Sequence, residues 1–75
     1  MATTAPVSCV ASIGETAGEV WRVLSENEPE PLALTKLVKA VDEPRDTVMQ
    51  ALGWLAREDK IDIVEEGRQR VVSLR

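Results

Sequence analysis

The chain has 75 residues, a net charge of −4, one cysteine and no histidine. This length allows one domain with a small core. The composition excludes an internal disulfide, a zinc site of the usual Cys/His kind and a catalytic triad built on histidine. A core this small is marginal without such support, so self-association is the support that remains.

Residues 1–11 are predicted to form a flexible N-terminal arm, because they are small and uncharged. The first basic residue is Arg22, so we expect no secretory signal. No apolar run is long enough to cross a membrane. The free thiol of Cys9 fits a reducing compartment, and we expect a cytoplasmic protein. Cys9 has no base nearby in the sequence, so an inert thiol is favoured over a nucleophile.

The stretch "SIGETAGEVWRVLSEN", residues 12–27, is predicted to be the first helix. Ser12 and Glu15 have the spacing of a capping box. Apolar residues follow at spacings of four, three and four, which define one helical face. They are Ile13, Ala17, Val20 and Leu24. Pro29 and Pro31 end the helix, because the residue before a proline avoids helical geometry.

A short extended piece, Leu32–Leu34, precedes a brief second helix that begins at Thr35. This helix offers Leu37, Val38 and Val41 to the core. The third helix begins at Pro44, which suits a first turn, and runs to about Asp59. Its buried stripe is expected to consist of Val48, Ala51, Leu52 and Leu55.

The hydrophobic period changes from helix to strand after Lys60. Ile61 and Ile63 alternate with Asp62, and Val72 and Leu74 alternate with Ser73. A turn containing Gly67 separates the two stretches, which predicts a β-hairpin. The register stays open, because "IV" and "VV" pairs break the strict alternation.

The element order predicts a mainly α (α+β) winged helix-turn-helix domain over residues 12–75. Three helices form the core, and the C-terminal hairpin is the wing. The short strand between the first two helices adds a third strand to the sheet.

Three motifs resemble a known family of small prokaryotic winged helix-turn-helix proteins with no assigned function. They are "IGETAGEVWRVL", "ALGWLARE" and "KIDI". The resemblance covers about Ile13 to Leu74 and implies the winged-helix fold, self-association and no established activity. It supplies no site residues. The arm before Ile13 and the acidic "ENEPEP" loop depart from it.

We expect no catalysis and no cofactor. The four glycines are scattered, so they form no phosphate-binding loop. Carboxylates on a small helical domain are typical of a solvated surface. A chain of this size is also expected to have little room for a pocket of ligand size.

Double-stranded DNA is one expected partner, because the second helix of this motif reads base edges and the wing contacts phosphates. The candidate contacts are Lys36, Lys39, Arg45, Gln50, Arg68 and Arg70. Ordinary solubilising surface residues are the alternative interpretation. Residues 31–75, which include the predicted helix-turn-helix and the wing, contain eight acids and eight bases. This part of the chain therefore has no net charge to attract phosphate. Residues 1–30 carry the whole net charge, which leaves the acidity on the first helix and its loop.

A second copy of the chain, or another protein, is the other expected partner. The candidate interface residues are Trp21, Met49, Gly53 and Trp54. Gly53 costs about 1 kcal/mol in a helix relative to alanine, which suggests the close approach of another backbone, from a partner or from the first helix. The plain interpretation of the two tryptophans is that at least one is a core anchor. The alternative is that one tryptophan is exposed and fills a pocket on a partner. A symmetric dimer would then bury the N-terminal arm, the first helix or the edge of the wing, whose unpaired strand amides can accept a second strand.

The sequence therefore predicts a non-catalytic, homodimeric module with a DNA-binding, transcription-regulator-like role. The alternative is a protein-interaction adaptor that uses the winged-helix fold without binding nucleic acid.

Overall fold

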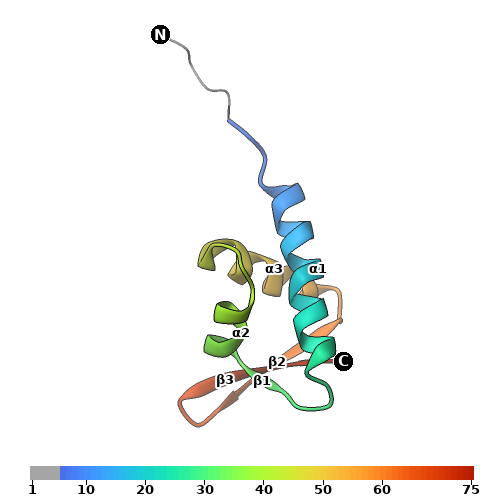
Figure 1. Cartoon of the computed structure of the whole chain (residues 1–75), viewed down its shortest axis with the longest axis vertical. Coiled ribbons are helices and arrows are strands. Elements are labelled where there is room, and N and C mark those ends of the chain that lie inside the picture. The colour runs from blue at the N-terminus through green and yellow to red at the C-terminus, as the bar shows by residue number, and fades with distance from the viewer. Residues whose placement is uncertain (1–5) are drawn as a thin grey trace.

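The computed structural model describes residues 6–75 and places in them three helices and one three-stranded antiparallel sheet (Figure 1). The elements in chain order are α1 (Val10–Glu26), β1 (Leu32–Ala33), α2 (Leu34–Ala40), α3 (Arg45–Arg57), β2 (Ile61–Glu66) and β3 (Gln69–Leu74). The predicted order of elements is confirmed, including the strand between the first two helices. The predicted ends of α2 and α3 differ from the observed ones by one or two residues.

Helix α1 begins two residues earlier than predicted, and the predicted capping box is wrong. Cys9 is the N-cap residue, and its side chain makes no hydrogen bond to the helix. The amide of Val10 donates instead to the hydroxyl of Ser8 at 3.2 Å. Ser12 therefore lies inside the first turn, and residues 10–11 of the predicted arm are helical. Residues 1–5 of that arm lie outside the described part of the chain.

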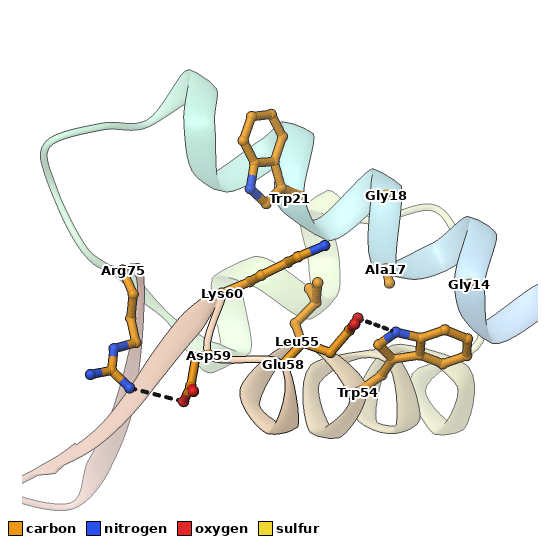
Figure 2. Close-up of a pocket in the computed structure, with 10 residues that line it drawn as sticks. All are labelled: Gly14, Ala17, Gly18, Trp21, Trp54, Leu55, Glu58, Asp59, Lys60 and Arg75. Carbon is orange, nitrogen blue, oxygen red and sulfur yellow. Dashed lines mark hydrogen bonds and ion pairs between the residues drawn. The ribbon is translucent and has the colours of Figure 1, made fainter.

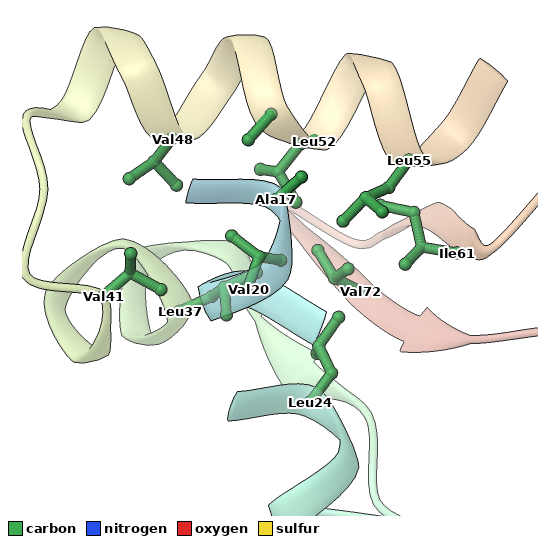
Figure 3. Packing of buried hydrophobic residues seen from close by; sticks show 11 residues of the cluster. Ala17, Val20, Leu24, Leu37, Val41, Val48, Leu52, Leu55, Ile61 and Val72 are labelled. Carbon is green, nitrogen blue, oxygen red and sulfur yellow. The ribbon is translucent and has the colours of Figure 1, made fainter. Parts of the chain in front are cut away.

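The core forms where the three helices meet the sheet. In Figure 3, Val48, Leu52 and Leu55 point from α3 toward side chains of α1, α2 and the strands. The buried apolar residues of the described chain are Ala17, Val20, Leu24, Leu37, Val41, Val48, Ala51, Leu52, Leu55, Ile61 and Val72. All four residues predicted for the buried stripe of α3 are confirmed. Thr16 is buried as well, because it lies one turn before Val20 on the same face.

A left-handed residue ends α3 and directs the chain into β2. Asp59 has a φ of 60°, and its amide donates to the carbonyl of Ala56 at 3.1 Å. The amide of Lys60 donates to the carbonyl of Leu55 at 3.0 Å. These two bonds form a Schellman motif, in which glycine is the usual left-handed residue. Asp59 occupies that position here, and its carboxylate pairs with Arg75 at 3.2 Å.

The sheet has the order β1-β3-β2, so β3 is the central strand. Ile63 pairs with Val72, and Val64 pairs with Val71 on the opposite face. Val72 is fully buried, whereas Ile63 is 36% exposed. The alternation predicted for β2 therefore gives one buried residue rather than two, because β2 is an edge strand that the helices cover at one end. Gly67, with a φ of 64°, supplies the left-handed conformation of the turn.

The first prediction concerns the core position at Leu52, which is 2% exposed. Leu52→Ala should lower the free energy of unfolding by about 2 to 5 kcal/mol, because the cavity cannot fully collapse. Urea unfolding followed by circular dichroism measures the change. Gln50→Ala, on the exposed face of the same helix, is the control and should stay within about 0.5 kcal/mol. An unchanged urea midpoint for Leu52→Ala would mean that α3 presents a different face to the core.

The second prediction compares the two left-handed residues, which have nearly the same φ. Asp59→Gly should raise the free energy of unfolding by about 0.5 to 1 kcal/mol, because it removes the strain of a side chain at positive φ. Gly67→Ala should lower it by about 1 kcal/mol or more for the same reason. The same urea experiment measures both. Changes of equal sign in the two variants would contradict this assignment of the backbone strain.

Candidate functional site

The helix-turn-helix of α2 and α3 carries four of the predicted DNA contacts, all on its exposed surface. Lys36 and Lys39 lie on α2, and Arg45 and Gln50 lie on α3. Within residues 6–75, none of these four side chains forms an ion pair or a hydrogen bond. The charged groups of the three bases and the amide of Gln50 are therefore exposed to solvent and available to a ligand.

The hairpin brings the two remaining predicted contacts beside the start of α2. Arg68 and Arg70 line a hollow of about 300 Å³ together with Leu34 and Thr35. A second hollow, of about 460 Å³, places Lys36 beside Glu66 and Gln69 of the hairpin. The structure thus gathers Lys36, Arg68 and Arg70 at one edge of the molecule. Arg45 and Gln50 do not line these hollows.

Acidic residues are interspersed with these bases. The Arg70 guanidinium lies 3.6 Å from the Glu65 carboxylate, its cross-strand neighbour. Both side chains are more than half exposed, so water and salt compete with this pair. Exposed carboxylates also precede and begin α3, at Asp42, Glu43 and Asp46. This edge is therefore a mixed surface rather than a continuous basic patch.

A third hollow, called here the tryptophan groove, lies between α1 and the end of α3 and has a volume of about 720 Å³. Its lining residues are Gly14, Ala17, Gly18, Trp21, Trp54, Leu55, Glu58, Asp59, Lys60 and Arg75. Figure 2 shows Trp21 on α1 and Trp54 on α3, with Lys60 extending toward α1. The volume falls within the range of ligand pockets, so the prediction that the domain has little room for one is wrong.

Neither tryptophan is a core anchor. Trp21 is 47% exposed and Trp54 is 39% exposed, so the plain interpretation of these residues is wrong. The indole Nε1 of Trp54 donates to Glu58 at 2.6 Å, which fixes the ring along its own helix. A Cβ added at Gly14 would lie 3.7 Å from the edge of that ring. The glycine therefore gives Trp54 a flat surface on α1 to lie against.

The other two predicted interface residues lie outside the groove. Met49 is 37% exposed, and Gly53 is exposed on α3. No atom lies within 4 Å of a Cβ added at Gly53, so α1 is not the close backbone inferred there. Gly14 and Gly18, which sequence reasoning missed, line the groove instead. Their spacing of four residues, continued three residues later by Trp21, was the available signal.

The side of α1 that faces away from the core carries a small ionic network. The Arg22 guanidinium pairs with Glu19 and with Glu26, the latter at 2.9 Å. The hydrogen bond from Arg22 holds the pKa of Glu19 below its usual range, and the two carboxylates raise the pKa of Arg22. These groups are exposed, so the network adds little to stability. It does fix the position of the one base on this helix.

Among residues 6–75, no three Cys, Asp or Glu side chains are grouped so as to hold a metal ion. No helix in the same range has the length and apolar character needed to span a membrane.

Known proteins resemble this chain in both sequence and fold. The chain is 35% identical over 63 residues to the uncharacterized protein MJ1608 of Methanocaldococcus jannaschii, with 84% of this chain and 90% of that protein covered. The structure of AF1382 from Archaeoglobus fulgidus has a TM-score of 0.69 at 16% identity, covering 81% of this chain and 69% of that one. At that identity the likeness shows the fold alone.

A structure of HOP2, described by its DNA recognition and protein interaction domains, is also similar. Its TM-score is 0.64 at 26% identity, covering 80% of this chain and 98% of that one. The family model described as winged helix-turn-helix domain (DUF2582) matches residues 9–74. The resemblance inferred from the sequence is confirmed, and the chain belongs to the DUF2582 family of winged helix-turn-helix domains.

Proposed function

We propose that this chain is a non-catalytic, homodimeric module that binds double-stranded DNA in the cytoplasm of a prokaryotic cell. The observation that carries the proposal is a set of exposed bases without an intrachain partner in the described residues. They are Lys36, Lys39, Arg45 and Arg68. They lie on the elements through which winged-helix proteins contact a duplex.

Each element has a distinct task in this proposal. Helix α3 enters the major groove, where Gln50 pairs with adenine and Arg45 pairs with guanine. The lysines of α2 and Arg68 of the turn contact phosphates, which supply affinity without sequence information. In Figure 1 the start of α3, helix α2 and the hairpin tip follow one another along one side of the molecule. One duplex can therefore meet all three elements.

The negative net charge is compatible with this arrangement. The acids that carry it belong to residues 1–30, mainly on α1 and its following loop. Figure 1 shows α1 on the other side of the molecule from the hairpin tip. The reading surface is then close to neutral, and DNA should bind weakly and only at low salt. The similarity to HOP2, whose structure is described by DNA recognition and protein interaction domains, supports both parts of the proposal.

A protein-interaction adaptor is the second candidate function. It is favoured by the exposed carboxylates Asp42, Glu43 and Asp46 around the start of α3, which would repel phosphate. The two half-exposed tryptophans also favour it, because tryptophan is enriched at interface hot spots.

The third prediction separates the two functions. Fluorescence anisotropy with a labelled random duplex should show binding at low salt that weakens steeply as salt rises, because released counterions drive the association. Arg45→Glu and Arg68→Glu should each weaken this binding. Each should also reduce the slope of the logarithm of the binding constant against the logarithm of salt concentration by about one or more, because a phosphate contact is lost.

Arg57→Glu is the matched control for these charge reversals. It makes the same change of charge in the last turn of α3, outside the tryptophan groove and far from the start of that helix, and should bind as the unmodified chain does. Absence of binding at low salt would refute the DNA function and leave the adaptor. Equal weakening by the control would show that net charge, rather than this surface, governs binding.

A further inference from the structure

We propose that the tryptophan groove is the homodimer interface, closed by a second copy of this chain whose α1 lies antiparallel to α1 of the first. The inference rests on the homodimer of the proposed function and adds the surface and the orientation. It does not depend on DNA binding.

A stripe of exposed and half-buried residues runs along α1 beside the buried one. Its residues follow at spacings of four, four, three and four, which place them on one helical face. They are Val10, Gly14, Gly18, Trp21 and Ser25. Val10 is 60% exposed and Trp21 is 47% exposed. The ring of Trp54, from α3, lies against Gly14 and continues the apolar surface of this stripe. Helix α1 thus presents the apolar side chains of Val10 and Trp21 to solvent beside Gly18, which is exposed, whereas Gly14 is half-buried because Trp54 of the same chain lies against it.

The stripe is complementary to itself when the second α1 runs antiparallel. A two-fold axis between Ala17 and Gly18 places Trp21 opposite the partner's Gly14, and Val10 opposite the partner's Ser25. The largest side chain of each copy therefore meets Gly14 of the other at the edge of the Trp54 ring that lies against it, and the exposed Gly18 allows the two helices to approach closely. In an isologous dimer both copies use the same surface, so one helix must carry both the large side chain and the small residue that receives it.

This arrangement also pairs the four tryptophans of the dimer. The ring of Trp54 lies 3.7 Å from the Cβ position of Gly14 in the same chain. The partner's Trp21, placed at that glycine, would pack against Trp54 at each end of the interface. Such aromatic pairs contribute beyond their buried area.

The charges along the edge of the stripe favour the antiparallel orientation. Glu15 has no ion-pair partner within the described chain, and Arg22, the one base on α1, is held by Glu19 and Glu26 of its own helix in an exposed network that a further carboxylate can join. In the antiparallel pair, Glu15 lies about 3 Å along the axis from the partner's Arg22, given 1.5 Å per residue. A parallel pair would instead set Trp21 against the partner's Trp21, so that two bulky rings would meet, and it would place Glu15 and the partner's Arg22 about seven residues apart along the axis.

The fourth prediction tests the location of the interface by sedimentation at tens of micromolar. The unmodified chain should sediment at twice its mass of 8.2 kDa. Gly18→Arg should weaken dimerisation by about thirtyfold or more, because it leaves an unpaired charge in the interface. Neither Gly18 nor Gly53 has an atom within 4 Å of an added Cβ, so both accept a side chain in the folded monomer. Gly53→Arg, outside the groove, is the matched control and should leave the dimer intact.

Cross-linking in a Cys9→Ser background tests the orientation. Val10→Cys combined with Ser25→Cys should give a disulfide-linked dimer under mild oxidation. Val10→Cys alone should not, because antiparallel copies of residue 10 lie 15 residues apart, about 22 Å along the axis. A disulfide requires Cα atoms within about 7 Å. The two positions are equally far apart within one chain, so a bridge inside the monomer is excluded.

The outcomes separate this inference from the proposed function. A dimer that survives Gly18→Arg, or that dissociates with Gly53→Arg, overturns the groove as the interface and leaves the homodimer standing. Cross-linking of Val10→Cys alone shows a parallel pair and overturns the orientation. An unmodified chain that sediments at 8.2 kDa removes the homodimer itself and this inference with it.

Discussion

Burial of one face of α3 against α1 and the sheet is the interaction on which the rest of the structure depends. Val48, Leu52 and Leu55 meet residues of the other elements in an interior made of aliphatic side chains (Figure 3). No aromatic residue is among the buried residues of the described chain, so the core closes on aliphatic side chains. Trp21 and Trp54 are therefore left at the flank, half exposed, where they line a groove rather than the interior.

The same burial separates the two candidate surfaces. Helix α3 turns its stripe inward and directs Trp54 along one flank toward α1, which leaves Gln50 and Arg45 facing solvent. Dimerisation through the groove and DNA binding through the helix-turn-helix would then use different sides of the helix and would not compete. A two-fold dimer would present two equivalent reading helices, which is the arrangement that matches the symmetric half-sites of a duplex.

Hydrophobic spacing was sufficient to predict the helices, the hairpin and the buried stripe of α3, because each depends on a period that the sequence shows directly. Three features depended on structure beyond that period. Ser12 matched a capping rule, but the helix continues past it to Cys9. Asp59 occupies a left-handed position that usually calls for glycine. The ring of Trp54 lies against Gly14, a contact between two helices that no local pattern reveals.

Quenching of tryptophan fluorescence by acrylamide, measured across a dilution series, tests most directly whether the core closes without its tryptophans. At low concentration the account predicts that acrylamide reaches both Trp21 and Trp54 and that their emission lies at long wavelength, because both rings contact water. At high concentration both signals should become protected as a second chain covers the groove. A population that is resistant to acrylamide at every concentration would place a tryptophan in the core and contradict the account.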